Sequence, residues 1–130
     1  MEITLVDISK ENALEKLQWY IDYVDDIYNQ LNNIDNLTFN EKVEMMKDLK
    51  EQYRDIKVNL KKDLDNLRHY KLTGIAARFY EPALRDMLHN SNLISVNQVV
   101  LKNITKFRSS LYDIRGYAKY WKSSMERYKD

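Results

Sequence analysis

The chain has 130 residues, with 21 basic and 20 acidic side chains and a formal net charge of +1. This length is typical of one domain that buries about two-thirds of its unfolded surface, so its core requires no disulfide or metal. The absence of cysteine excludes disulfides, thiolate metal ligands and cysteine nucleophiles, and two glycines with one proline favour helices over turn-rich folds. We therefore expect a single all-α domain over residues 1–130.

The first helix is predicted over residues 10–33. Ser9 is a suitable N-cap, because its hydroxyl can accept a hydrogen bond from the first turn. Apolar residues then recur at steps of three and four, a heptad pattern typical of helices that pack along one stripe. The stripe consists of Leu14, Leu17, Ile21, Val24, Tyr28 and Leu31.

The second helix is predicted over residues 39–72. Thr38 and Glu41 have the spacing of a capping box, and Thr73-Gly74 offers a stop signal. Its apolar stripe consists of Phe39, Val43, Met46, Leu49, Tyr53, Ile56, Leu60, Leu64 and Leu67. The third helix is short, over residues 75–90, and Pro82 predicts either two pieces or one kinked helix.

The last helix is predicted over residues 96–128, after a second capping box formed by Ser95 and Gln98. Its stripe is the most regular in the chain: Val100, Ile104, Phe107, Leu111, Ile114, Ala118, Trp121, Met125 and Tyr128. Three long helices and one short helix predict an elongated antiparallel bundle. Because the helices differ in length, we expect part of a long stripe to stay exposed unless the protein forms a homodimer or binds a partner there.

The search for catalytic chemistry favours a protein that is not an enzyme. Two histidines, His69 and His89, lie on different predicted helices without metal-ligand spacing, so we expect no metal and no cofactor. Arg85 and His89 resemble the Arg-to-His motif of helical ribonucleases of the nucleotide-binding type found in higher eukaryotes and prokaryotes. Their separation is shorter than that family uses, which leaves ribonuclease activity a minor alternative.

The two ends of the chain carry opposite charge. Residues 1–36 hold eight acidic residues against two lysines, a net charge of −6, and residues 95–130 hold eight basic residues against three acidic ones, a net charge of +5. On the last predicted helix a basic stripe follows one position after the apolar stripe. It consists of Arg108, Tyr112, Arg115, Lys119, Lys122 and Lys129.

Three interpretations of the basic stripe stay open. It can face the acidic first helix inside the bundle and fix helix pairing, it can face an acidic protein surface, or it can bind nucleic-acid phosphate.

The first predicted helix carries two aromatic residues, Trp19 and Tyr23, on its outward side beside Asp22 and Asp26. We expect these two rings to pack against another surface, because Trp and Tyr contribute much of the binding free energy of interfaces. Three surfaces can cover this pair: the short third helix, a second copy of the chain or a protein partner. An acidic surface with aromatic residues can also mimic nucleic acid toward a basic target.

The sequence therefore predicts a non-enzymatic module for protein–protein interaction. One form of this hypothesis is an inhibitor of host or defence machinery encoded by a mobile genetic element. The alternative is a nucleic-acid-binding accessory protein that uses the basic stripe. The N-terminal residues lack the basic and apolar segments of a secretion signal, and no apolar run approaches the length of about 20 residues that spans a membrane, so we expect a cytoplasmic protein without a membrane partner.

Overall fold

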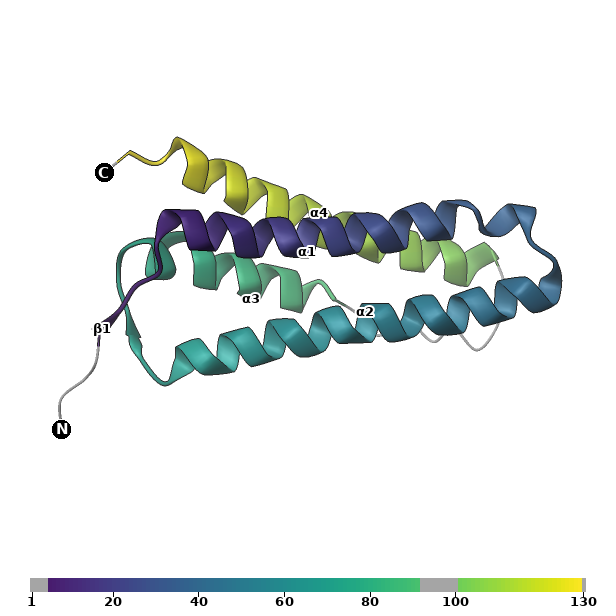
Figure 1. Ribbon diagram of the computed structural model, residues 1–130, viewed down its shortest axis with the longest axis horizontal. Coiled ribbons are helices and arrows are strands. Elements are labelled where there is room, and N and C mark those ends of the chain that lie inside the picture. The colour runs from purple at the N-terminus through teal and green to yellow at the C-terminus, as the bar shows by residue number, and fades with distance from the viewer. Residues whose placement is uncertain (1–4, 92–100, 130) are drawn as a thin grey trace.

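The computed structural model describes residues 5–91 and 101–129 and confirms an all-α helical bundle. Its long helices are α1 (Lys10–Asn32), α2 (Phe39–Arg68) and α4 (Leu101–Arg127), and the short helix is α3 (Glu81–His89). Successive helices run in alternating directions along one long axis, so α1 is antiparallel to both α2 and α4 (Figure 1). The described ends of the chain lie at the same end of the bundle.

The predicted caps of the first two helices are present. Ser9 accepts a hydrogen bond from the backbone N–H of Asn12 at 3.1 Å. At α2 the Thr38 hydroxyl accepts from the Glu41 N–H at 3.3 Å, and the Glu41 carboxylate accepts from the Thr38 N–H at 2.9 Å. These bonds satisfy donors that the first turn of a helix leaves free, and so fix where each helix begins.

The end of α2 differs from the prediction, because the helix ends at Arg68 and does not continue to residue 72. Residues 71–72 instead form strand β2 (Lys71–Leu72), which pairs in parallel with β1 (Leu5–Val6). The backbone N–H of Thr73 donates to the carbonyl of Val6 at 3.0 Å, which extends this pairing. The N-terminal segment thus supplies backbone partners that replace the last helical turn.

Gly74 connects this short pairing to the next helical segment. Its φ is +54°, a left-handed conformation that favours glycine, and a Cβ there would lie 2.3 Å from Oδ2 of Asp7. The other carboxylate oxygen of Asp7 accepts a hydrogen bond from the Ala76 N–H at 3.0 Å. Asp7 therefore caps the helical segment from a position 69 residues earlier in the chain.

The segment around Pro82 is one continuous helical run and not two separate pieces. A π-helical turn at Ala76–Tyr80 leads directly into α3. In that turn the Glu81 N–H bonds to the Ala76 carbonyl, one residue farther back than in an α-helix. The wider turn lies immediately before Pro82, which has no N–H to donate to the helix ladder.

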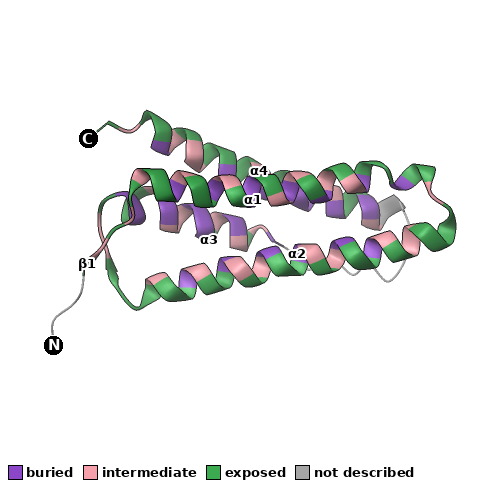
Figure 2. Ribbon diagram, viewed as in Figure 1, coloured by how far each residue is buried: buried purple, intermediate pink, exposed green. Residues whose placement is uncertain are grey.

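The core lies along the axis between the four helices, where the buried faces turn toward one another (Figure 2). Helix α1 packs against α4 and α2, and α3 fills the space between α2 and α4. Apart from Phe39, which is 69% exposed, the predicted stripes are buried or half-buried wherever the structure describes them. The expected exposed portion of a long stripe is therefore restricted, in this part of the chain, to Phe39 at the start of α2.

Three expectations concern residues outside the described ranges. The predicted start of the last helix at residue 96, the capping box of Ser95 and Gln98, and the apolar residue Val100 all lie there. The described portion of α4 ends at Arg127, one residue before the predicted end.

Candidate protein-binding surface

Three aromatic side chains of α1 lie together where α1 meets α2. Trp19 contacts Tyr20 and Tyr23 edge to face, with ring centroids 5.0 and 5.4 Å apart. Tyr20 is buried, whereas Trp19 is 47% exposed. Trp19 is therefore an apolar ring at the surface that is oriented by two neighbouring rings.

Hydrogen bonds to α2 hold the two tyrosines. The hydroxyl of Tyr20 donates to Oδ2 of Asp63 at 2.6 Å, and that of Tyr23 donates to Oδ2 of Asp55 at 3.1 Å. We call the α1–α2 seam the set formed by Trp19, Tyr20, Tyr23, Asp55, Asn59 and Asp63. Asp55, Asn59 and Asp63 follow one another at steps of four residues, which places them on one face of α2.

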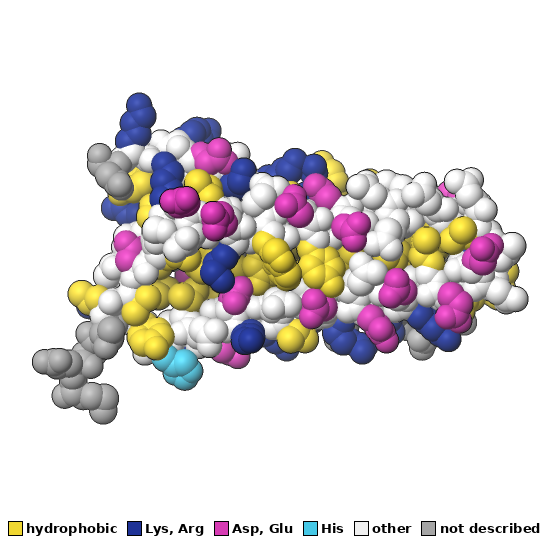
Figure 3. All heavy atoms as spheres, viewed as in Figure 1, with side chains coloured by type: hydrophobic (Ala, Val, Ile, Leu, Met, Phe, Trp, Pro, Cys, Tyr) yellow, Lys and Arg dark blue, Asp and Glu magenta, His cyan; other side chains and the backbone are white. Residues whose placement is uncertain are grey.

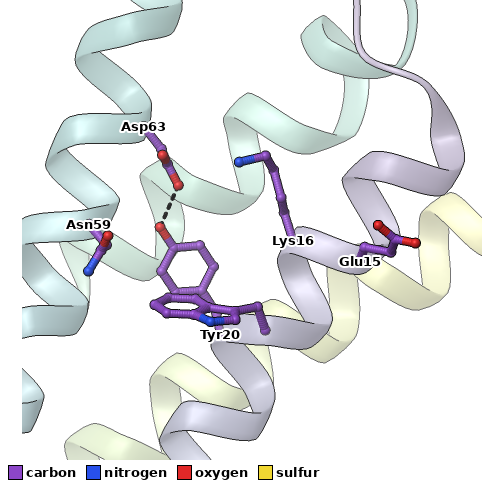
Figure 4. A pocket seen from close by; sticks show the side chains of 6 residues that line it. Glu15, Lys16, Tyr20, Asn59 and Asp63 are labelled. Carbon is purple, nitrogen blue, oxygen red and sulfur yellow. Dashed lines mark hydrogen bonds between the residues drawn. The ribbon is translucent and has the colours of Figure 1, made fainter.

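A groove of about 370 Å³ opens beside Trp19 and is lined by residues of both helices. In Figure 4 the Tyr20 hydroxyl points toward Asp63, with Asn59 to one side and Lys16 to the other. Glu15 lies at the edge of the same groove. The groove thus has an aromatic wall with polar groups around its rim, an arrangement suited to holding an apolar side chain of a protein partner.

The surroundings of Tyr23 are acidic. Burial, the hydrogen bond to Asp55 and the negative charges of Asp55, Asp26 and Asp48 raise the pKa of Tyr23 to about 12. Figure 3 shows hydrophobic side chains in a row between α1 and α2, with acidic side chains on both sides of the row and basic side chains among them. The aromatic surface is therefore flanked by negative charge from two helices.

These carboxylates have neutral partners in the described part of the chain. Asp22, Asp26 and Asp48 each accept a hydrogen bond from a glutamine on the same helix, at 2.7, 3.1 and 3.1 Å. None of the ion pairs between described residues includes these three carboxylates or Asp55. Their charge is therefore not neutralised by a paired cation and contributes to the potential at the surface.

Among the predicted partner-binding residues, the structure brings Trp19 and Tyr23 into contact and places Asp26 among the charges that act on Tyr23. Asp22 lies on the exposed side of α1. Helix α3, one of the expected covers for Trp19, packs mainly against α2 and α4, and Trp19 stays half exposed. The expectation that α3 covers this aromatic pair is therefore wrong.

The basic stripe of α4 lies largely along α1. Arg115 forms an ion pair with Asp25 of α1. Lys119 and Lys122 line a hollow of about 330 Å³ together with Asp25, and Lys122 also pairs with Glu126 at 3.2 Å. The central part of the stripe thus faces the acidic first helix.

The remaining members of the stripe differ in their surroundings. Arg108 is half-buried, and its Nε has no hydrogen-bond partner within the described ranges. Tyr112 is exposed and lines a hollow of about 360 Å³ with Asp25, Tyr28 and Asn29 of α1, and Lys129 is exposed beyond the end of the helix. The stripe is therefore not one continuous exposed basic surface.

Arg85 and His89, the residues of the ribonuclease alternative, lie on α3. Arg85 pairs with Glu81 at 3.2 Å, and His89 is exposed at the end of the helix. Over residues 5–91 and 101–129 we found no group of His, Asp and Glu that could hold a metal ion, and no helix with the length and apolar character to cross a membrane. Comparison with family models, with curated proteins and with solved structures gave no match to this chain.

Proposed function

We propose that this protein is a non-enzymatic binding module whose α1–α2 seam binds a basic surface of another protein. The observation that carries the proposal is the half-exposed Trp19 ring, held by two tyrosines between a groove lined by Glu15, Lys16 and Asp63 and the acidic surroundings of Tyr23. A module of this kind inhibits its target by occupying the target's surface, and it requires no catalytic residue.

The aromatic part of the seam supplies binding free energy. Tryptophan and tyrosine are enriched at the energetic centres of interfaces, because they bury a large area with few rotatable bonds. Trp19 is already oriented by its ring contacts, so it loses less conformational freedom on binding than a free surface side chain. The groove next to it accepts an apolar side chain of the partner.

The carboxylates in and beside the seam select the partner. Asp22, Asp26, Asp48 and Asp55 have no paired cation in the described residues, so an acidic partner surface is repelled and a basic one is attracted. Arginine is the preferred cation for such a surface, because it stacks on aromatic rings and also binds carboxylates with two hydrogen bonds.

A peptide array tests this proposal. Short peptides graded by net charge and apolar content are incubated with the wild-type protein, with Trp19→Ala and with Phe39→Ala, whose side chain is an exposed aromatic outside the seam. The proposal predicts retention on basic peptides that contain apolar residues, loss of that retention in Trp19→Ala, and unchanged retention in Phe39→Ala. Equal retention on acidic peptides, or retention that survives Trp19→Ala, would contradict it.

A further inference from the structure

Helix α2 presents two hydrogen-bond acceptors to the groove beside Trp19. Tyr20 donates to Oδ2 of Asp63 at 2.6 Å, and no described residue donates to Oδ1 of that carboxylate. The amide Nδ2 of Asn59 donates to the backbone carbonyl of Asp55 at 2.8 Å, which leaves the amide oxygen as an acceptor without a described donor. Asn59 and Asp63 lie four residues apart, so both acceptors are on the same wall of the groove.

The α1 side of the groove supplies an aromatic ring and two charged side chains. Trp19 is half exposed, and Glu15 at the edge of the groove belongs to no ion pair between described residues. Lys16 turns its amino end toward Asp63 in Figure 4, but these two residues form no ion pair. The residues that line the groove therefore carry two negative charges and one positive charge.

An aromatic ring beside acceptors that lack donors is complementary to the side chain of arginine. A guanidinium group is a planar cation with five N–H donors and no acceptor, and it stacks on aromatic rings. The apolar stem of arginine can lie along Trp19 while the donors reach Asp63 and Asn59. The ammonium group of lysine is a compact and strongly hydrated charge, so it cannot stack and donate in this way.

We propose that the groove beside Trp19 is a pocket for one arginine side chain of the partner protein. This inference rests on the proposed function, because it assumes that the α1–α2 seam binds a basic surface, and it names the side chain that enters the groove. The guanidinium group donates to Oδ1 of Asp63 and to the amide oxygen of Asn59, and its stem packs on Trp19. Lys16 opposes binding, because its ammonium group repels a second cation on the same side of the groove.

Three matched peptides test which side chain the groove accepts. Each peptide has blocked ends and carries arginine, lysine or citrulline between leucines; citrulline keeps the shape of arginine but replaces the charged donor end with a neutral urea group. Calorimetry with the wild-type chain is predicted to show that the arginine peptide binds about tenfold more tightly than either of the others. Equal affinity for the arginine and lysine peptides would overturn the arginine pocket and leave the proposed function standing. Absence of binding by both of these peptides would overturn the proposed function as well.

Variants on α2 test where the guanidinium group binds. Asp63→Asn keeps an acceptor for the Tyr20 hydroxyl but removes the charge, so it is predicted to weaken binding of the arginine peptide about tenfold. Asn59→Ala removes the second acceptor and is predicted to weaken binding about threefold. Asp65→Asn is the matched control, because Asp65 is an exposed carboxylate of α2 outside the groove lining, and it should leave the affinity unchanged. Equal losses in Asp63→Asn and Asp65→Asn, or full binding in Asn59→Ala, would overturn the proposal.

Lys16→Met gives a test of opposite sign, because damage to the fold cannot improve binding. Removal of the ammonium group from the groove is predicted to strengthen binding of the arginine peptide about twofold to fivefold. Lys61→Met makes the same change in net charge at an exposed lysine of α2 outside the groove lining, and it should change the affinity less than about twofold. Weaker binding in Lys16→Met, or the same gain in both variants, would overturn the proposal.

Discussion

Replacing Tyr20 with phenylalanine removes one hydroxyl group from the contact between α1 and α2 and leaves the ring that supports Trp19. The Tyr20 side chain is 1% exposed, and its hydroxyl donates to the Asp63 carboxylate at 2.6 Å. A hydrogen bond to a charged acceptor contributes about 1.5–3 kcal/mol. Asp63 also lines the open groove, where water can replace the lost donor, so we expect the lower end of that range, about 1.5 kcal/mol.

Urea unfolding followed by circular dichroism measures this loss. A change of that size lowers the melting temperature by about 5 °C for a chain of this length, and the dependence on urea should stay the same because the buried surface changes little. Tyr70→Phe removes a hydroxyl from an exposed tyrosine and serves as the matched control. A free energy of unfolding within about 0.5 kcal/mol of the wild type for Tyr20→Phe would refute the view that this bond fastens α1 to α2.

Three further variants test other parts of the fold. Gly74→Ala should lower the free energy of unfolding by at least about 1 kcal/mol, because alanine disfavours a φ of +54° and its Cβ would contact Asp7. Refolding yields and thermal melts measure the effect, and an unchanged melting temperature would contradict the expectation. The contribution of Tyr23 to stability should be complete below pH 10.0, which is the pKa of tyrosine in the unfolded chain, and should decline as the pH rises toward the folded pKa of about 12. Tyr23→Phe should therefore make the fall of stability at alkaline pH shallower. An alkaline profile identical to that of the wild type would show that the pKa of Tyr23 is not raised. Arg115→Met should lower the free energy of unfolding by about 0.5–1 kcal/mol in low salt, because the ion pair with Asp25 is partly exposed. The double variant Arg115→Met/Asp25→Asn should lose no more than Arg115→Met alone. Additive losses in denaturant titrations would exclude the pairing.

The helical architecture could be predicted from the chain because its apolar periodicity and its caps agree. The alternation of apolar residues along α4 and the capping box at Thr38 are local patterns that act within one helix. The end of α2 could not be predicted in this way. It depends on the pairing of Lys71 and Leu72 with residues 5 and 6, which is a contact between distant segments without a pattern of its own.

The candidate surface was predicted only in part. Trp19 and Tyr23 were identified because large aromatic residues on an outward helical face are unusual. Tyr20 and its partner Asp63 were missed, since a heptad stripe is narrower than the buried face of a helix in a globular bundle. A second row of α1, formed by Ala13, Leu17, Tyr20, Val24, Ile27 and Leu31, is also buried and has the same alternating spacing. This wider pattern would have assigned Tyr20 to the interior.

The charge around the α1–α2 seam determines which kind of partner it favours. The α1–α2 seam is flanked by carboxylates without paired cations among the described residues, so it favours a partner of opposite charge. Trp19→Ala should therefore change peptide binding.

The fluorescence of Trp19 provides the most direct test of the proposed binding site. Trp121→Phe leaves Trp19 as the single tryptophan of the chain, and Trp121 lies away from the seam, with its Nε1–H donating to Asp86 of α3. Titration with a short peptide that contains arginine and leucine should shift the emission of Trp19 to shorter wavelength as the ring leaves water, and about 1 M salt should weaken the binding because it screens exposed charges. Saturable binding of that peptide without any change in Trp19 emission would contradict the account, because it would place the basic partner elsewhere on the molecule.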